Sequence, residues 1–165
     1  MNYFLKDLRI VSQNVNSLNI STYNKNDMHL NRFFQKINAV LSLSPDIFLL
    51  QDIRIGKQSN VLIRYLRNNQ FGNFKVIINS NKSSRGVLIG FKLDLDINIV
   101  DQFLDIEQNI LLLKCSLNNT LITIGSIYGP LQKDNSNFMD EVFSQISKFN
   151  TEHFIVGGGF QCSYQ

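Results

Sequence analysis

The chain has 165 residues, of which 44% are hydrophobic and 18% charged, so it is long and apolar enough to form one globular domain with its own core. Sixteen Lys and Arg against thirteen Asp and Glu leave a net charge of +3 at pH 7, so attraction to a polyanion has to come from local clusters of basic side chains. Two isolated cysteines exclude a disulfide framework, and the longest apolar runs, such as residues 110–113, are far shorter than the ~20 residues of a membrane-spanning helix, so we expect an intracellular protein without a membrane partner.

Apolar periodicity in the first half of the chain predicts strands alternating with helices. Short apolar runs predict three strands, at residues 8–14, 47–51 and 74–79. Helical spacing of apolar residues predicts two helices, one through Phe33, Phe34, Ile37, Val40 and Leu41 and one at about residues 60–69, with Ser59 as its N-cap. The Asn-rich stretch 16–31 is expected to be a loop.

Strands dominate the second half. Apolar runs predict strands at residues 86–91, 97–103, 109–117 and 120–128. Asn118-Asn119 joins the last two, and asparagine tolerates the positive φ of a tight hairpin turn. A helix at 136–149 then precedes a closing strand at 153–156. This order predicts a single domain of residues 1–165 with an α+β fold, an α/β sandwich of two packed mixed β-sheets flanked by helices.

Four of the predicted strands end in distinctive polar or glycine-rich segments, at residues 12–18, 50–54, 126–130 and 156–161. In layered α/β proteins the residues that follow apolar strands are presented at a shared edge of the sheet. We therefore expect these four segments to form the functional site.

The order and spacing of these segments carry a resemblance. Asn14 ends the first strand, Pro45-Asp46 opens an apolar strand that ends in Gln51-Asp52, Tyr128-Gly129-Pro130 ends a later strand, and Gly157-Gly158-Gly159-Phe160-Gln161 follows the last. The start of another strand, Ser84-Arg85-Gly86-Val87, also fits. The chain resembles the endonuclease/exonuclease/phosphatase superfamily, in particular the apurinic-type endonuclease domain of non-LTR retrotransposons. The resemblance implies that fold, with its C-terminal part missing here.

The resemblance also implies a chemistry. Phosphodiester hydrolysis in this superfamily needs a divalent cation, usually Mg²⁺, held by carboxylate oxygens. Asp52 stands where the family has its metal-binding Glu, Asn14 would orient that carboxylate, and Tyr128 would donate its hydroxyl to the phosphate. Gly159 replaces the Asp that activates water and Gln161 the Asn that steadies the phosphate. Because glycine offers no base and the family's final His segment has no counterpart, we expect little turnover.

Each candidate also has a plainer interpretation. Asp52 is alternatively a surface carboxylate paired with Arg54, Tyr128 an amphipathic residue at the rim of a sheet, and Asn14 one of many asparagines. The three basic residues that flank one predicted strand are either nucleic-acid contacts or a solvated face: Lys82, Arg85 and Lys92.

Three functions therefore stay open. The leading hypothesis is a retroelement-type endonuclease-like domain, related to Mg²⁺-dependent DNA-nicking hydrolases and catalytically impaired, with DNA as its partner and a reverse transcriptase in the same polyprotein. The rival is a non-enzymatic nucleic-acid-binding or protein-binding scaffold, supported by Gly159 and Gln161. A third is a small-molecule or lipid phosphatase of the same superfamily.

Overall fold

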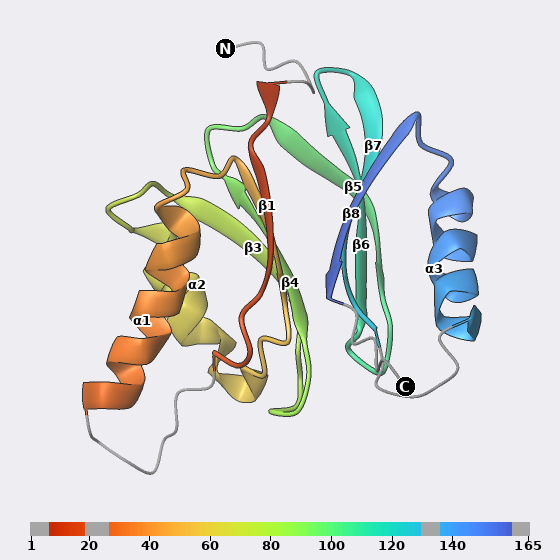
Figure 1. Ribbon diagram of the computed structural model, residues 1–165. Helices are drawn as coiled ribbons and strands as arrows, with labels where there is room; N and C mark the ends of the chain where they lie inside the picture. The colour runs from red at the N-terminus through yellow and green to blue at the C-terminus, as the bar shows by residue number, and fades with distance from the viewer. Residues whose placement is uncertain (1–6, 19–26, 130–135, 160–165) are drawn as a thin grey trace.

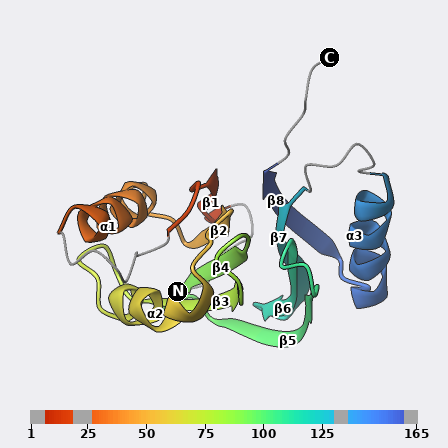
Figure 2. The same ribbon diagram turned by 90° about the horizontal axis from the view of Figure 1, so that it is seen from below.

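The computed structural model describes residues 7–18, 27–129 and 136–159, which form a sandwich of four layers (Figure 1). Helices α1 (Asp27–Leu41) and α2 (Ser59–Arg67) cover the outer face of the first sheet, and α3 (Ser136–Phe149) covers the outer face of the second. Figure 2 shows the two sheets facing each other between these helices. None of the helices in the described segments is long and apolar enough to cross a bilayer.

Both sheets are mixed, as the sequence predicted. The first has the order β1 (Ile10–Asn14), β2 (Ile47–Gln51), β4 (Val87–Lys92) and β3 (Phe74–Asn79). The second has the order β5 (Ile97–Leu104), β6 (Ile110–Leu117), β7 (Thr120–Tyr128) and β8 (His153–Gly159). The pairs β1–β2 and β7–β8 are parallel and the other pairs antiparallel. The predicted α/β sandwich is therefore confirmed.

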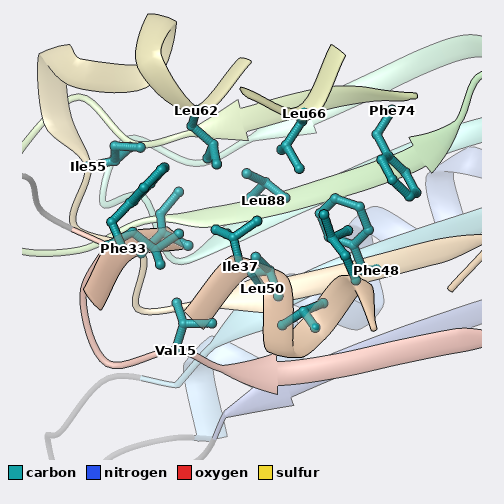
Figure 3. Close-up of a cluster of buried hydrophobic side chains, with 14 residues drawn as sticks. Val15, Phe33, Ile37, Phe48, Leu50, Ile55, Leu62, Leu66, Phe74 and Leu88 are labelled. Carbon is teal, nitrogen blue, oxygen red and sulfur yellow. The ribbon is translucent and has the colours of Figure 1, made fainter. Parts of the chain in front are cut away.

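Three apolar clusters separate the layers. The first fills the space under α1 and α2, where Phe33 and Ile37 of α1 and Leu62 and Leu66 of α2 point toward the sheet (Figure 3). The second lies between the sheets and includes Leu49 and Leu113. The third lies under α3. Burial on both faces explains why β2 and β4 are continuous apolar runs rather than alternating ones.

Local chemistry accounts for the element boundaries that the sequence predicted well and for those it missed. Asn118 and Asn119 have φ of 49° and 65°, so the hairpin turn is confirmed. Helix α1 begins at Asp27, inside the predicted loop 16–31. Ser59 is the first residue of α2 and not its N-cap, because a 3₁₀ turn, Gly56–Gln58, leads directly into the helix. Strand β8 continues to Gly159 rather than ending at residue 156, because its glycines stay paired with β7.

Gly157 permits a close approach of the two sheets. A Cβ atom at this position would lie 2.4 Å from Ser12 Oγ in β1 and 2.7 Å from Leu49 Cδ1 in β2. Such distances are far inside van der Waals contact, so a side chain larger than hydrogen would push β8 away from β1 and β2.

We predict that Gly157→Ala lowers the free energy of unfolding by about 1–3 kcal/mol, the usual cost of overpacking a core. Gly159→Ala is the matched control, because a Cβ there would meet its nearest atom, Tyr128 Cδ2, at 3.2 Å, a gap that a small shift relieves. Urea denaturation of both variants measures the difference. Equal losses of stability would contradict the close packing at Gly157.

Candidate functional site

The carboxyl ends of β1, β2, β7 and β8 gather at one end of the sandwich, the lower end in Figure 1. In the register of the parallel pairs, Asn14 lies beside Gln51 and Tyr128 beside Gly159. A Cβ atom on Gly159 would lie 3.2 Å from the Tyr128 ring and 3.4 Å from Asn14 Nδ2. The structure thus brings together three of the predicted site residues from three strands: Asn14, Tyr128 and Gly159.

Asp52 follows β2 at the same end and is bound to Arg54. Arg54 Nε lies 2.6 Å from Asp52 Oδ1 and Arg54 Nη2 lies 2.8 Å from Oδ2, so one guanidinium donates to both carboxylate oxygens. The pairing that the plainer interpretation named is therefore present. The carboxylate is not on the surface, however, because Asp52 is 3% exposed. Arg54 keeps 39% of its side chain exposed.

The backbone of residues 52–54 holds this pair in place. Asp52 and Arg54 have φ of 56° and 49°, in the left-handed region. The Asp52 carbonyl accepts a hydrogen bond from Ser17 N at 2.8 Å, and Ile53 N donates to Gly86 O at 3.0 Å. The segment is thus tied to the loop after β1 on one side and to the start of β4 on the other.

Arg54 also connects Asp52 with Tyr128 in the other sheet. Hydrogen bonding to Asp52 is the main cause that raises the pKa of Arg54, and the charge and hydrogen bonding of Tyr128 raise it further. Tyr128 is buried. The guanidinium therefore lies between the end of β2 and the end of β7, where it joins the two halves of the site.

Gln51 forms a polar link beneath these residues. Its Nε2 lies 3.1 Å from Ser126 Oγ in β7 and 3.2 Å from Ser12 Oγ in β1, and Ser126 Oγ donates to Leu50 O at 3.1 Å. Gln51 and Ser126 are both buried. The sequence contained a signal for this role, since an amide that ends an apolar strand must find partners when it is buried.

Lys36 of α1 fixes the loop that follows Asn14. Its Nζ donates to the carbonyl oxygens of Val15, Asn16 and Ser17 at 2.8, 2.7 and 2.7 Å. Asn14 Oδ1 accepts a hydrogen bond from Asn16 N at 2.9 Å. Because the side-chain oxygen is turned toward this loop, the Nδ2 group of Asn14 is the part that faces Gly159.

These contacts test whether the site suits Mg²⁺, which prefers several oxygen ligands in octahedral geometry. Both Asp52 oxygens accept from Arg54, and Asn14 Oδ1 accepts from Asn16 N rather than facing Asp52. Among the described residues, no group of three or more His, Cys, Asp or Glu side chains lies close enough together to hold a metal ion. In this arrangement the donor set does not fit the cation, which would have to displace the guanidinium.

Of the three basic residues that flank β4, only Lys92 lies away from this end, because Arg85 immediately precedes Gly86, which accepts a hydrogen bond from Ile53. Lys92 Nζ is 3.3 Å from Asp46 Oδ1 at the opposite end of β4, so Lys82, Arg85 and Lys92 do not form one surface. Arg85 Nη1 lies 3.7 Å from Glu107 Oε2. Burial raises the pKa of the Cys115 thiol to about 12, which excludes a thiolate nucleophile at neutral pH. Gln161 and Cys162 lie outside the described residues.

Several solved structures superpose on this chain. Humanized D. rerio TDP2 superposes with a TM-score of 0.64 at 12% identity, over 92% of this chain and 65% of that one. The 3′ phosphatase NExo from Neisseria, bound to product DNA hairpin, gives a TM-score of 0.54 at 17% identity over 93% and 57% of the two chains. The endonuclease domain of TRAS1, a telomere-specific non-LTR retrotransposon, gives 0.54 at 14% identity over 92% and 57%.

The chain has the endonuclease/exonuclease/phosphatase fold. It spans less than two thirds of the length of these three neighbours. No protein-family model and no curated protein sequence matches it.

We predict that Gln51→Leu lowers the free energy of unfolding by about 1–3 kcal/mol, because it leaves the buried Ser126 hydroxyl without its amide partner. Gln102→Leu, on the exposed face of β5, is the matched control and is expected to change stability by no more than about 0.5 kcal/mol. Thermal and urea denaturation measure both. If the two substitutions cost the same, Gln51 is not the link between the sheets.

Proposed function

We propose that this chain is a retroelement-type endonuclease-like domain that recognises nucleic acid, DNA in the first instance, and has little or no phosphodiester-cleaving activity. The observation that carries the proposal is the convergence of Asn14, Tyr128 and the Asp52–Arg54 pair at one end of the sandwich, around Gly159. The fold that the chain shares with the TRAS1 endonuclease domain and with DNA-bound NExo supports the choice of substrate class. A reverse transcriptase in the same polyprotein belongs to this proposal.

Gly159 is the reason for expecting little cleavage. General acid–base help contributes about 10²–10⁴ in rate, and glycine has no group that accepts a proton. The space in front of Gly159 lies between the Tyr128 ring and the Asn14 amide, so a side chain added there would enter the site itself. The position is therefore the right one for a water-activating base, and the base is missing.

A non-enzymatic nucleic-acid-binding scaffold is the second candidate. One observation favours it: Arg54 occupies both oxygens of Asp52, the residue that would otherwise hold the metal. A domain with this pair keeps guanidinium N–H donors at the site without any metal cation.

Nicking of supercoiled plasmid separates these two functions. We expect no cleavage, or cleavage at the limit of detection, for the wild-type chain with Mg²⁺. We further expect Gly159→Asp with Gln161→Asn to raise the nicking rate when a Ser-Asp-His segment is appended after Gln165, because the base and its His partner act together. Asp94→Asn, an exposed carboxylate beyond the opposite end of β4, is the control and leaves the rate unchanged.

EDTA-sensitive nicking by the wild-type chain would show that the chain cleaves DNA even with glycine at position 159. Rescue by Gly159→Asp and Gln161→Asn without the appended segment would contradict the account of the missing base.

A further inference from the structure

The acceptor atoms of Asp52 and Asn14 are engaged within the site, whereas part of its main donor, Arg54, is exposed. Both Asp52 oxygens receive hydrogen bonds from Arg54, and Asn14 Oδ1 receives one from Asn16 N. A backbone N–H can only donate, so this bond fixes the orientation of the Asn14 amide and leaves its NH₂ group toward Gly159. The positive charge of Arg54 beside the Asp52 oxygens repels a metal cation, whereas its N–H groups attract an anion.

Arg54 is the strongest of these donors. A guanidinium has five N–H groups; Asp52 engages Nε and one N–H of Nη2, and Tyr128 also hydrogen-bonds to the group. The exposed part of Arg54, 39% of the side chain, leaves it accessible from solvent. The planar fork of N–H groups matches the oxygens of a phosphate, and a buried carboxylate behind it holds the plane in one orientation.

We propose that Arg54, held by Asp52, takes the place of the divalent cation in this site and binds a phosphodiester of nucleic acid without metal. Asn14 Nδ2 and Tyr128, which lie beside Gly159 at the same sheet edge, complete the phosphate-binding surface. Asp52 is then a positioning residue for Arg54 and not a metal ligand. This inference rests on the proposed recognition of nucleic acid.

The two roles of Asp52 predict a different dependence on Mg²⁺ when its charge is removed. Asn at position 52 keeps the shape of the side chain and tolerates the φ of 56° observed there. If Asp52 holds a metal, Asp52→Asn abolishes Mg²⁺-dependent DNA binding. If Arg54 is the phosphate ligand, Asp52→Asn weakens binding about threefold whether or not Mg²⁺ is present, because the guanidinium keeps its charge but loses the carboxylate that orients it.

Fluorescence anisotropy with a fluorescein-labelled duplex DNA measures the affinity of each variant for DNA, with Mg²⁺ in one series and EDTA in the other. We expect equal affinity of the wild-type chain in both series, the same small loss for Asp52→Asn in both, and a loss of about tenfold for Arg54→Ala, as for one charge-assisted contact. Arg67→Ala is the matched control. It removes the same charge from an exposed position at the end of α2, near the opposite end of the first sheet, and is expected to change affinity less than about twofold.

Folding of each variant is checked by circular dichroism and thermal melting. If Arg54→Ala does not fold, because Asp52 is then buried without a partner, Arg54→Lys replaces it. Lysine keeps the charge but cannot form the fork, so we expect a severalfold loss of affinity that Mg²⁺ does not restore. Retention of full affinity by Arg54→Lys would overturn the proposed phosphate contact.

Calorimetric titration with Mg²⁺ in the absence of DNA tests whether the Asp52–Arg54 pair excludes the cation. We expect no binding heat for the wild-type chain, and measurable binding for Arg54→Ala once the Asp52 oxygens are free. Mg²⁺ binding by the wild-type chain, or EDTA-sensitive DNA binding that Asp52→Asn abolishes, would overturn the inference. An absence of DNA binding under all conditions would instead refute nucleic-acid recognition, and the Mg²⁺ titration would still decide whether Arg54 excludes the metal.

Discussion

The close approach of the two sheets at β1, β2, β7 and β8 is the constraint on which the site depends. Gly157 provides the space for it, and the Gln51 amide spans it to Ser126. In each sheet the two strands concerned run parallel, so their carboxyl ends lie at the same end of the sandwich. Residues that are far apart in sequence, Asn14 and Gly159, are neighbours for this reason. If the sheets were further apart, each sheet would carry half a site.

The Asp52–Arg54 pair is the second constraint, and its energetics explain why it is rigid. Removing a carboxylate from water is costly, and Asp52 is 3% exposed, so the two hydrogen bonds from Arg54 offset a large desolvation penalty. Left-handed φ at both residues costs about 1–2 kcal/mol each for side chains with a Cβ. The backbone hydrogen bonds to Ser17 and Gly86 hold the segment in that conformation. The surrounding fold thus stabilises the strained backbone of residues 52–54, which holds the Arg54 guanidinium in one orientation.

The fold could be predicted from the sequence because the patterns that mark its strands and turns are local. Asn118-Asn119 marks a tight turn, and the strands β2 and β3 were predicted to the residue, because short apolar runs between polar breaks have few other interpretations. The site was predicted in part. Asn14, Tyr128 and Gly159 follow from strand ends, whereas Lys36 lies on a helix and acts through three backbone carbonyls, which no spacing rule reveals. The bidentate pairing of Asp52 with Arg54 depends on the positive φ angles of both residues. In an extended strand the side chains of residues i and i+2 point to the same face but run side by side, so the sequence alone does not predict that these two meet.

Two features of the site have one physical consequence. The strained loop holds the short Asp52 side chain within reach of Arg54, and Gly159 places no acid near Asn14 and Tyr128 that would compete for that guanidinium. With one carboxylate and one guanidinium in contact, the pair has no net charge, and N–H donors of Arg54 and Asn14 lie beside it. The pairing of Asp52 with Arg54 and the lack of a side chain at Gly159 therefore act in the same direction. Each leaves fewer acceptor atoms available at the site, which favours an anion over a cation.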